Sequence, residues 1–146
     1  MEDRYLYKAK TTPKEKGEFN NVWVTGNLIV SNGKYYIHPV NNFVNLKNEI
    51  GRIIVMHQVI PDTICQCTGL KDKNGKLIWE NDIVAYWDTY STENGQAEAD
   101  CVGKVVWDDE TISFQVTNRL CAESYEVLDE CSVLGNAIDN PELLEV

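Results

Sequence analysis

The sequence lacks the motifs that usually identify an enzyme. It contains no G-x-G-x-x-G or G-x-x-x-x-G-K-[ST] phosphate-binding loop, no G-x-S-x-G nucleophile turn and no H-E-x-x-H zinc helix. The only histidines, His38 and His57, form no local cluster that could serve as a base or as metal ligands. We therefore expect no enzymatic activity, no catalytic residues, no cofactor and no bound metal.

Features of secreted or membrane proteins are also missing. There is no run of 18 apolar residues, so we expect no transmembrane helix and no membrane partner. The opening residues, Met1 to Arg4, lack the basic and then apolar profile of a signal peptide. The cysteines number five, which argues against a disulfide framework. These features favour a cytoplasmic protein with reduced thiols.

Cys65 and Cys67 form a C-x-C pair. In a strand, residues two apart point to the same face, so both thiols could reach one metal ion. The spacing is not the C-x-x-C of zinc sites, and a metal would need two further ligands. We favour the interpretation that both are small buried hydrophobic residues, and metal binding stays the open alternative.

Basic residues are scarce in the second half of the chain. The 146 residues carry 13 Lys and Arg against 23 Asp and Glu, a net charge of −10. Residues 1–58 have a net charge of +3, residues 59–86 of −1, and residues 87–146 of −12. Such a balance argues against general phosphate-backbone binding, which makes nucleic acid an unlikely partner. The acidic residues either form a solvated surface or face a basic partner, and we favour the solvated surface.

Strand signals are frequent, whereas helical periodicity is scarce. Asn-Gly pairs at 32–33 and 74–75 lie between apolar runs and predict hairpins, the first with a type I′ turn. A third hairpin is predicted across the acidic residues 108–110, with Ile112, Phe114 and Val116 buried and the residues between them exposed. Hairpins at this spacing predict a mainly β fold, as a small barrel or a pair of packed sheets.

Other segments complete this prediction. Residues 52–60 are β-branched and apolar, which predicts a core strand, and residues 39–48 are either a loop or a helical turn. The polar residues 91–99 predict a loop. Asn140 and Pro141 predict the N-cap and first position of a short C-terminal helical turn.

Two segments resemble the signatures of the YopX family. Residues 68–76 (TGLKDKNGK) and 78–84 (IWENDIV) are similar to the family's central T-G-L-x-D-x-N-G-x-x-I-[YF]-E-G-D-I-V. Residues 133–144 (VLGNAIDNPELL) are similar to its closing V-[IL]-G-N-[IV]-[YH]-x-N-P-E-L-L. Asn81 replaces the usual glycine, and we expect the turn to survive because Asn tolerates a positive φ. The likeness is strong over residues 64–146 and weak over residues 1–60.

The resemblance implies a phage or prophage protein of a bacterial host cell, without an established catalytic activity. It implies a mainly β fold that contains a small Src-homology-3-like barrel built from hairpins, with short helical turns. We accordingly expect residues 1–60 to be an N-terminal β segment and residues 61–146 the barrel core, joined as one compact unit. Asp82 is expected to brace the turn before its strand.

Three functions are compatible with the sequence. The favoured one is a non-enzymatic accessory protein, a β module that binds a protein partner or self-assembles into a homo-oligomer. The alternatives are an acidic DNA mimic that inhibits a host factor, and a weak nucleic-acid binder that uses the hairpin at residues 71–76. The candidate interaction surface comprises seven residues: Lys71, Lys73, Lys76, Trp79, Asp108, Asp109 and Glu110.

Overall fold

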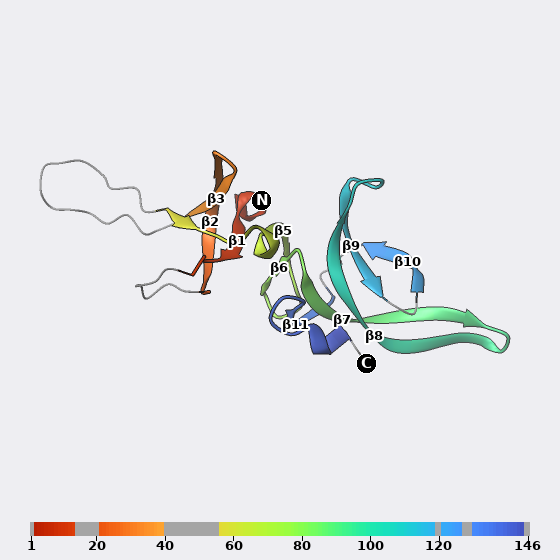
Figure 1. Cartoon of the computed structure of the whole chain (residues 1–146). Coiled ribbons are helices and arrows are strands. Elements are labelled where there is room, and N and C mark those ends of the chain that lie inside the picture. The colour runs from red at the N-terminus through yellow and green to blue at the C-terminus, as the bar shows by residue number, and fades with distance from the viewer. Residues whose placement is uncertain (1, 14–20, 40–55, 119–120, 127–129, 145–146) are drawn as a thin grey trace, which may run out of the picture. The chain divides into compact units, whose positions relative to one another are not determined.

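The structure is a computed structural model of the 146-residue chain, and it describes residues 2–13, 21–39, 56–118, 121–126 and 130–144. The chain divides into two compact units, Met1–Cys67 and Thr68–Val146. Figure 1 traces the strands along the chain. The strand β5 begins in the first unit and ends in the second.

The first unit is built on antiparallel strands. After a 3-10 turn at Glu2–Tyr5 come four strands, a second 3-10 turn at Pro61–Thr63 and the start of a fifth strand. The strand order of the sheet is β4-β3-β2-β1-β5-β6, of which β6 belongs to the second unit. The bounds of the strands are β1 Tyr7–Lys10, β2 Trp23–Ser31, β3 Lys34–Pro39, β4 His57–Gln58 and β5 Cys65–Lys71.

The predicted Asn32-Gly33 hairpin is confirmed. Ser31 pairs with Lys34, and the two residues between them have φ values of 51° and 72°. Both central residues of a type I′ turn need a positive φ, and Asn and Gly adopt it at the lowest cost. β2 and β3 therefore form one continuous hairpin.

One face of this hairpin and of β1 packs around a small core of Ala9, Ile37 and Val59. Val59 lies just after β4, and its partner in an isolated bridge is Thr11. The predicted core strand at 52–60 is thus seen only in its last part, since residues 52–55 lie outside the described residues, as does most of the segment 39–48.

The second unit contains a five-stranded antiparallel sheet in the order β10-β9-β8-β7-β11. β7 and β8 form its longest hairpin (Figure 1). A 3-10 turn at Pro141–Leu144 follows the last strand, as the Asn-Pro pair predicts. The strands are β6 Leu77–Trp79, β7 Asp82–Thr92, β8 Gly95–Asp108, β9 Ser113–Asn118, β10 Cys121–Glu126 and β11 Ser132–Asn136.

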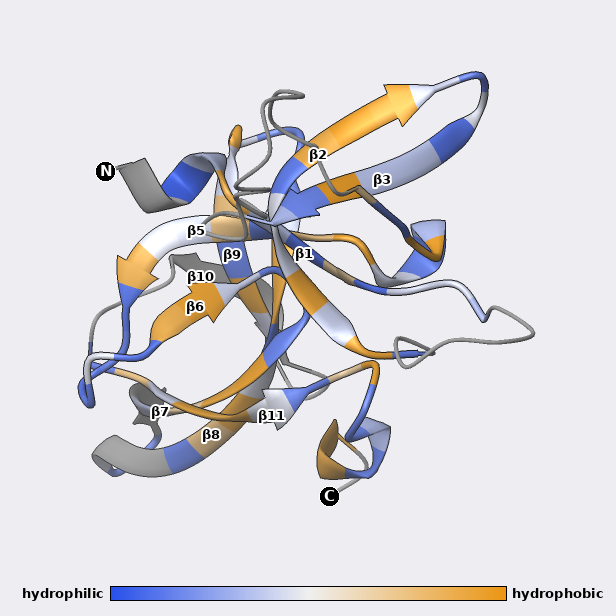
Figure 2. Ribbon diagram, turned by 90° about the vertical axis from the view of Figure 1, so that its left-hand side faces the viewer, coloured by the Kyte–Doolittle hydropathy of each residue, from blue (hydrophilic) through white to orange (hydrophobic). Residues whose placement is uncertain are grey.

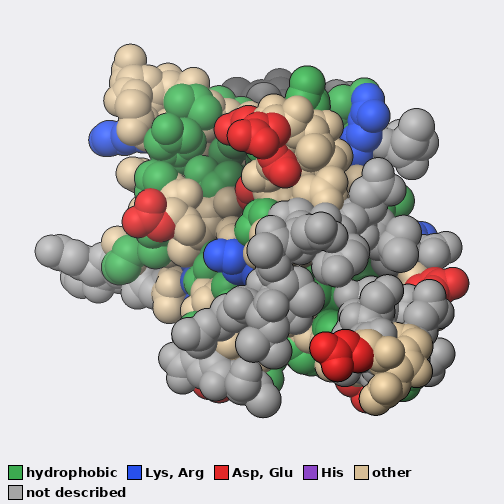
Figure 3. Space-filling view, turned by 90° about the vertical axis from the view of Figure 1, so that its right-hand side faces the viewer, with side chains coloured by type: hydrophobic (Ala, Val, Ile, Leu, Met, Phe, Trp, Pro, Cys, Tyr) green, Lys and Arg blue, Asp and Glu red, His purple; other side chains and the backbone are tan. Residues whose placement is uncertain are grey.

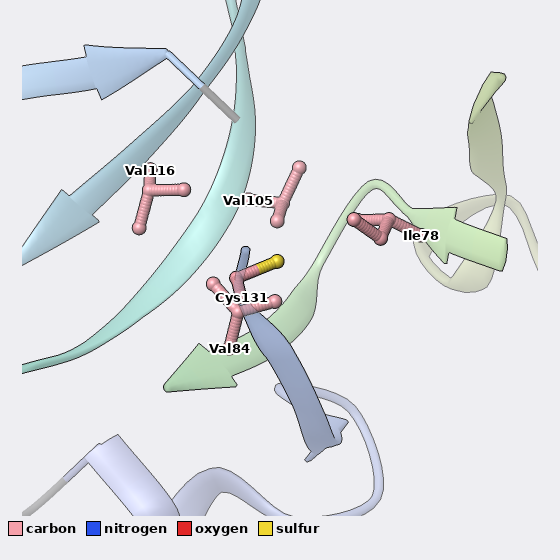
Figure 4. Close-up of a cluster of buried hydrophobic side chains, with 5 residues drawn as sticks. All are labelled: Ile78, Val84, Val105, Val116 and Cys131. Carbon is pink, nitrogen blue, oxygen red and sulfur yellow. The ribbon is translucent and has the colours of Figure 1, made fainter. Parts of the chain in front are cut away.

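The core of the second unit comes from five segments that are distant in sequence. Figure 4 shows side chains from β6, β7, β8 and β9 lying together with Cys131, which directly precedes β11. Figure 2 shows the matching hydrophobic colouring of β6. Burial of these small and branched side chains joins the hairpin β5–β6 to the larger sheet of the same unit. The cluster comprises Ile78, Val84, Val105, Val116 and Cys131.

The mainly β prediction is confirmed, with two antiparallel sheets, but the closed barrel is wrong. A barrel requires the two edge strands of a sheet to pair with each other. In the described part of the second unit, β10 pairs with β9 and β11 pairs with β7, so the sheet stays open. No helix among the described residues is long and apolar enough to cross a membrane.

Two local predictions are also wrong. Residues 91–99 are no loop, because Thr92 pairs with Gly95 and both strands continue from there as a hairpin. Asn94 lies in the hairpin turn and Gly95 begins β8, although both belong to a polar segment. In β9, Gln115 is 5% exposed whereas Ile112 is 76% exposed. Ile112 precedes the strand and belongs to the turn, which removes it from the alternating pattern.

Candidate interaction surface

The side chain of Asp72 connects the β5–β6 turn to β11 of the second unit. Its Oδ1 accepts hydrogen bonds from the backbone N–H groups of Asn74 and Lys76, each at 2.9 Å. Its Oδ2 accepts the N–H of Val133, 61 residues further along, at 2.9 Å. The bond from Val133 lowers the pKa of Asp72, with the bonds from Lys76 and Asn74 acting in the same direction and burial opposing them. The carboxylate is a structural clamp between the central and closing signatures.

The turn at residues 80–82 is a second clamp. Asn81 adopts a φ of 70°, which its amide side chain tolerates better than other non-glycine residues do. Its N–H donates to the carbonyl of Val105, and its own carbonyl accepts the N–H of Ala137, both at 2.8 Å. Oδ2 of Asp82 accepts the N–H of Trp79 at 2.8 Å, which confirms the predicted bracing of this turn.

The closing signature forms its own network. Oδ1 of Asn136 accepts the N–H groups of Ile138 and Asp139 at 3.1 and 2.8 Å. Oδ1 of Asn140 accepts the N–H of Asn136 at 3.3 Å, so this side chain faces back toward β11. Gly135 leaves no space for a side chain, because a Cβ there would lie 2.5 Å from Oδ1 of Asn140. These polar groups are engaged in holding the backbone.

The cysteine pair lies in the interior. Cys65 and Cys67 are both 0% exposed, as the favoured interpretation of buried hydrophobic residues requires. The described residues contain no group of three or more His, Cys, Asp or Glu side chains that could hold a metal ion.

Three of the seven candidate surface residues form what we term the lysine hairpin, namely Lys71, Lys73 and Lys76. All three are exposed around the β5–β6 turn. Trp79, in contrast, is only 8% exposed, so its ring belongs to the interior and is not presented to a partner. The Asn74-Gly75 hairpin forms as predicted, but only Gly75 has a positive φ, of 81°, and its N–H bonds to the carbonyl of Asp72 at 3.0 Å.

The other three residues lie at the end of β8 and in the turn to β9, and we term residues 107–112 the acidic turn. Oδ1 of Asp108 accepts the N–H of Glu110 at 2.9 Å and thereby shapes the turn. Oδ1 of Asp109 accepts the indole N–H of Trp107 at 2.8 Å. Asp109 and Glu110 are themselves exposed. The acidic turn is thus an ordered surface feature.

The acidic turn also carries exposed apolar side chains. Trp107 is 42% exposed, although its ring packs edge-on against Phe114 with centroids 5.0 Å apart. Ile112 is 76% exposed, more than any other large apolar side chain among the described residues. Its φ of 52° is rare for a β-branched residue. The sequence pattern placed Ile112 in the buried face of β9 and so missed this feature.

The lysine hairpin and the acidic turn are separate surfaces of the second unit, at the β5–β6 and β8–β9 connections (Figures 1 and 2). On the face drawn in Figure 3, the acidic side chains that are described appear in separate places, with hydrophobic side chains exposed between them.

A further basic feature lies in the first unit and was missed by the sequence reasoning. The ammonium groups of Lys8 and Lys10 lie 4.9 and 5.5 Å from the ring centroid of Trp23. The available signal was the alternation Lys8-Ala9-Lys10 in a short strand, which places both lysines on the face opposite the buried alanine.

A comparison of the chain with family models identifies the same family as the sequence signatures do. The model described as YopX protein matches residues 2–145, which is nearly the whole chain. The chain belongs to the YopX family. Membership therefore extends over residues 1–60, where the sequence signatures are weak. No curated protein matches the chain.

Proposed function

We propose that this YopX protein is a non-enzymatic, phage-type accessory module that binds a protein partner through the acidic turn. The observation that carries the proposal is Ile112, a β-branched residue that is 76% exposed at a φ of 52°. This side chain contributes little to burial and occupies a backbone conformation that favours glycine or asparagine. Folding alone gives no reason for isoleucine here.

Trp107 strengthens the proposal. Tryptophan is enriched at binding hot spots, where a partner removes it from water. The exposed side chain of Ile112 would add apolar area to such a contact. Flanking Asp109 and Glu110 would add a charged rim that selects a partner with basic groups. The indole of Trp107 is held by Asp109 and by the Phe114 ring, so little side-chain freedom would be lost on binding.

The polar residues of the family signatures support a non-enzymatic function. The Asp72 carboxylate, the Asn81 backbone and the Asn136 amide are used to hold turns and strands, as described above. Folding accounts for the presence of these three residues in the family pattern. None of the three is a nucleophile with a base beside it.

Of the two alternatives, the nucleic-acid interpretation is weakened, because Trp79 beside the lysine hairpin is buried and cannot stack on a base. The DNA-mimic interpretation depends on the same carboxylates as the acidic turn, but it does not explain the exposed apolar residues Trp107 and Ile112.

The experiment is capture of bacterial proteins by the immobilised chain. The wild type is compared with the double variant Trp107→Ala/Ile112→Gly and with a control variant, Leu70→Ala/Leu134→Ala, whose leucines are exposed by 42% and 49%. A defined protein should bind the wild type and the control but not the turn variant. Equal retention by all three chains, or retention of nucleic acid alone, would contradict the proposal.

A further inference from the structure

We propose that the edge of β7 at residues 87–92 accepts a lysine- or arginine-rich segment of a partner protein as an additional strand. These residues belong to the outer part of the β7–β8 hairpin, residues 87–100, which we term the arm. The inference goes beyond the proposed function, because the arm is a different element from the acidic turn and would bind through its backbone.

The arm is a ribbon of two strands. β7 and β8 pair continuously as far as Thr92 opposite Gly95. In the described part of the second unit, the pairing of β11 with β7 reaches Ala85, and that of β9 with β8 reaches Lys104. Figure 1 shows β7 and β8 continuing beyond these positions as a hairpin. Of the described strands, only β8 pairs with residues 87–92.

Such an edge can form a ladder of hydrogen bonds with a further strand. Every second residue of an antiparallel strand directs its N–H and C=O groups away from the strand it is paired with. Many proteins protect an edge of this kind with a proline or a lysine. Residues 87–92 contain neither, and so the edge has no such barrier to the addition of a strand.

The charge of the arm indicates what kind of strand it accepts. The second unit, residues 68–146, carries five basic and seventeen acidic residues, a net charge of −12. Such a field attracts a basic segment over a long range and repels an acidic one. The arm itself has no Lys or Arg and four acidic residues, namely Asp88, Glu93, Glu98 and Asp100.

Trp87 provides an anchor for the side chains of the added strand. It is 60% exposed, so most of its ring is not used in the core of the second unit. It pairs directly with Asp100, which is also exposed, and the two residues therefore lie on the same face of the arm. A lysine on that face of the added strand can lay its stem along the indole and direct its ammonium group toward the carboxylate.

A second copy of this chain does not fit the edge. Two arms paired edge to edge would bring two sets of four acidic residues together, and like charges on neighbouring strands are destabilising. A nucleic acid is repelled by the same residues, because its backbone is anionic. A basic segment of another protein meets neither obstacle.

The probe for the test is a synthetic peptide of about eight residues in which lysine and threonine alternate, a length typical of a strand. One control peptide has the same sequence with every backbone nitrogen methylated, so it keeps the charge but lacks main-chain donors. A second control has glutamate in place of each lysine. Hydrogen exchange of the full chain is then measured with each peptide. Only the unmodified lysine peptide should slow exchange at residues 87–92.

Two variants of the full chain test the side chains, after circular dichroism has established that each is folded. Trp87→Ala should weaken binding of the lysine peptide about tenfold, whereas the control Tyr5→Ala, which removes another exposed aromatic ring, should bind it as the wild type does.

The charge variant is Glu93→Gln/Asp100→Asn, and it should bind more weakly and with less dependence on salt. Its control removes two exposed carboxylates outside the arm, Asp62→Asn/Glu142→Gln, and should have the smaller effect.

Several results would overturn the inference. Unchanged exchange at residues 87–92 with millimolar lysine peptide would exclude an added strand. Equal binding of the methylated peptide would reduce the contact to charge alone, and equal affinity of Trp87→Ala and Tyr5→Ala would remove the anchor. Slower exchange in the arm when the chain alone is concentrated would assign the edge to a second copy. None of these results bears on capture through the acidic turn, so the proposed function is tested separately.

Discussion

Replacing Ile112 by glycine should change the stability of the protein by about 1 kcal/mol or less while weakening its binding. A non-glycine residue in the left-handed region costs about 1–2 kcal/mol. Glycine removes that cost but adds about 0.5–1 kcal/mol of backbone entropy. Because the side chain is 76% exposed, its burial contributes only about a quarter of the full value, or about 0.5 kcal/mol. The net result ranges from about 0.5 kcal/mol of destabilisation to about 1 kcal/mol of stabilisation.

The assay is thermal unfolding followed by circular dichroism. A gain of 1 kcal/mol corresponds to a rise in Tm of about 2–4 °C for a chain of this size. Ile29→Gly is the control, because Ile29 is 36% exposed inside β2, where glycine is unfavourable, and it should lower the Tm. The reasoning is refuted if Ile112→Gly lowers the Tm as much as Ile29→Gly does, since Ile112 would then be needed for folding. An unchanged affinity for the partner would refute its role in binding.

Three further substitutions test the fold of each unit. Ile78→Ala should cost about 2–5 kcal/mol in unfolding experiments because Ile78 is 0% exposed in the core, whereas Leu134→Ala, at 49% exposure, should cost far less. Asp72→Asn should lower the Tm at neutral pH. The pKa of Asp72 is lowered in the folded state, so its contribution is present above the unfolded pKa of about 3.9 and is lost as pH falls through the folded pKa. The Tm difference between wild type and variant should therefore shrink below about pH 4, and a constant difference would contradict the role of the charge. Gly26→Ala should destabilise the first unit by about 1–3 kcal/mol, because the added Cβ would collide with the carbonyl oxygen of His38. An unchanged denaturant midpoint of unfolding would contradict this prediction.

The hairpins were predictable because their turn residues have strong local preferences. Asn32 and Gly33 adopt the positive φ values that a type I′ turn needs, and Asn81 adopts one where the family has glycine. The mainly β class follows from these hairpins and from the apolar runs between them. Local chemistry thus determines much of the secondary structure in the described parts of the chain.

Closure of the sheet was not predictable from local patterns. Whether two edge strands pair depends on the twist and length of every strand between them. β7 and β8 are much longer than expected, because the polar residues 91–99 predicted a loop where both strands continue. The clamp from Asp72 to Val133 links residues 61 apart, and no local spacing encodes that link.

The candidate surface was predicted in part. The three lysines and the acidic residues 108–110 come to the surface because charged side chains remain hydrated. Trp79 was misplaced because a short strand gives too few residues to distinguish its two faces, and Ile112 was misplaced because it lies one residue before its strand begins. Burial at such positions depends on tertiary packing.

Hydrogen exchange of the wild-type chain, measured alone and with a captured partner, is the most direct test of the acidic turn as a binding element. The partner should slow exchange in the amides of the acidic turn, while exchange around the lysine hairpin stays the same. An acidic turn that exchanges equally fast with and without the partner would contradict its role in binding.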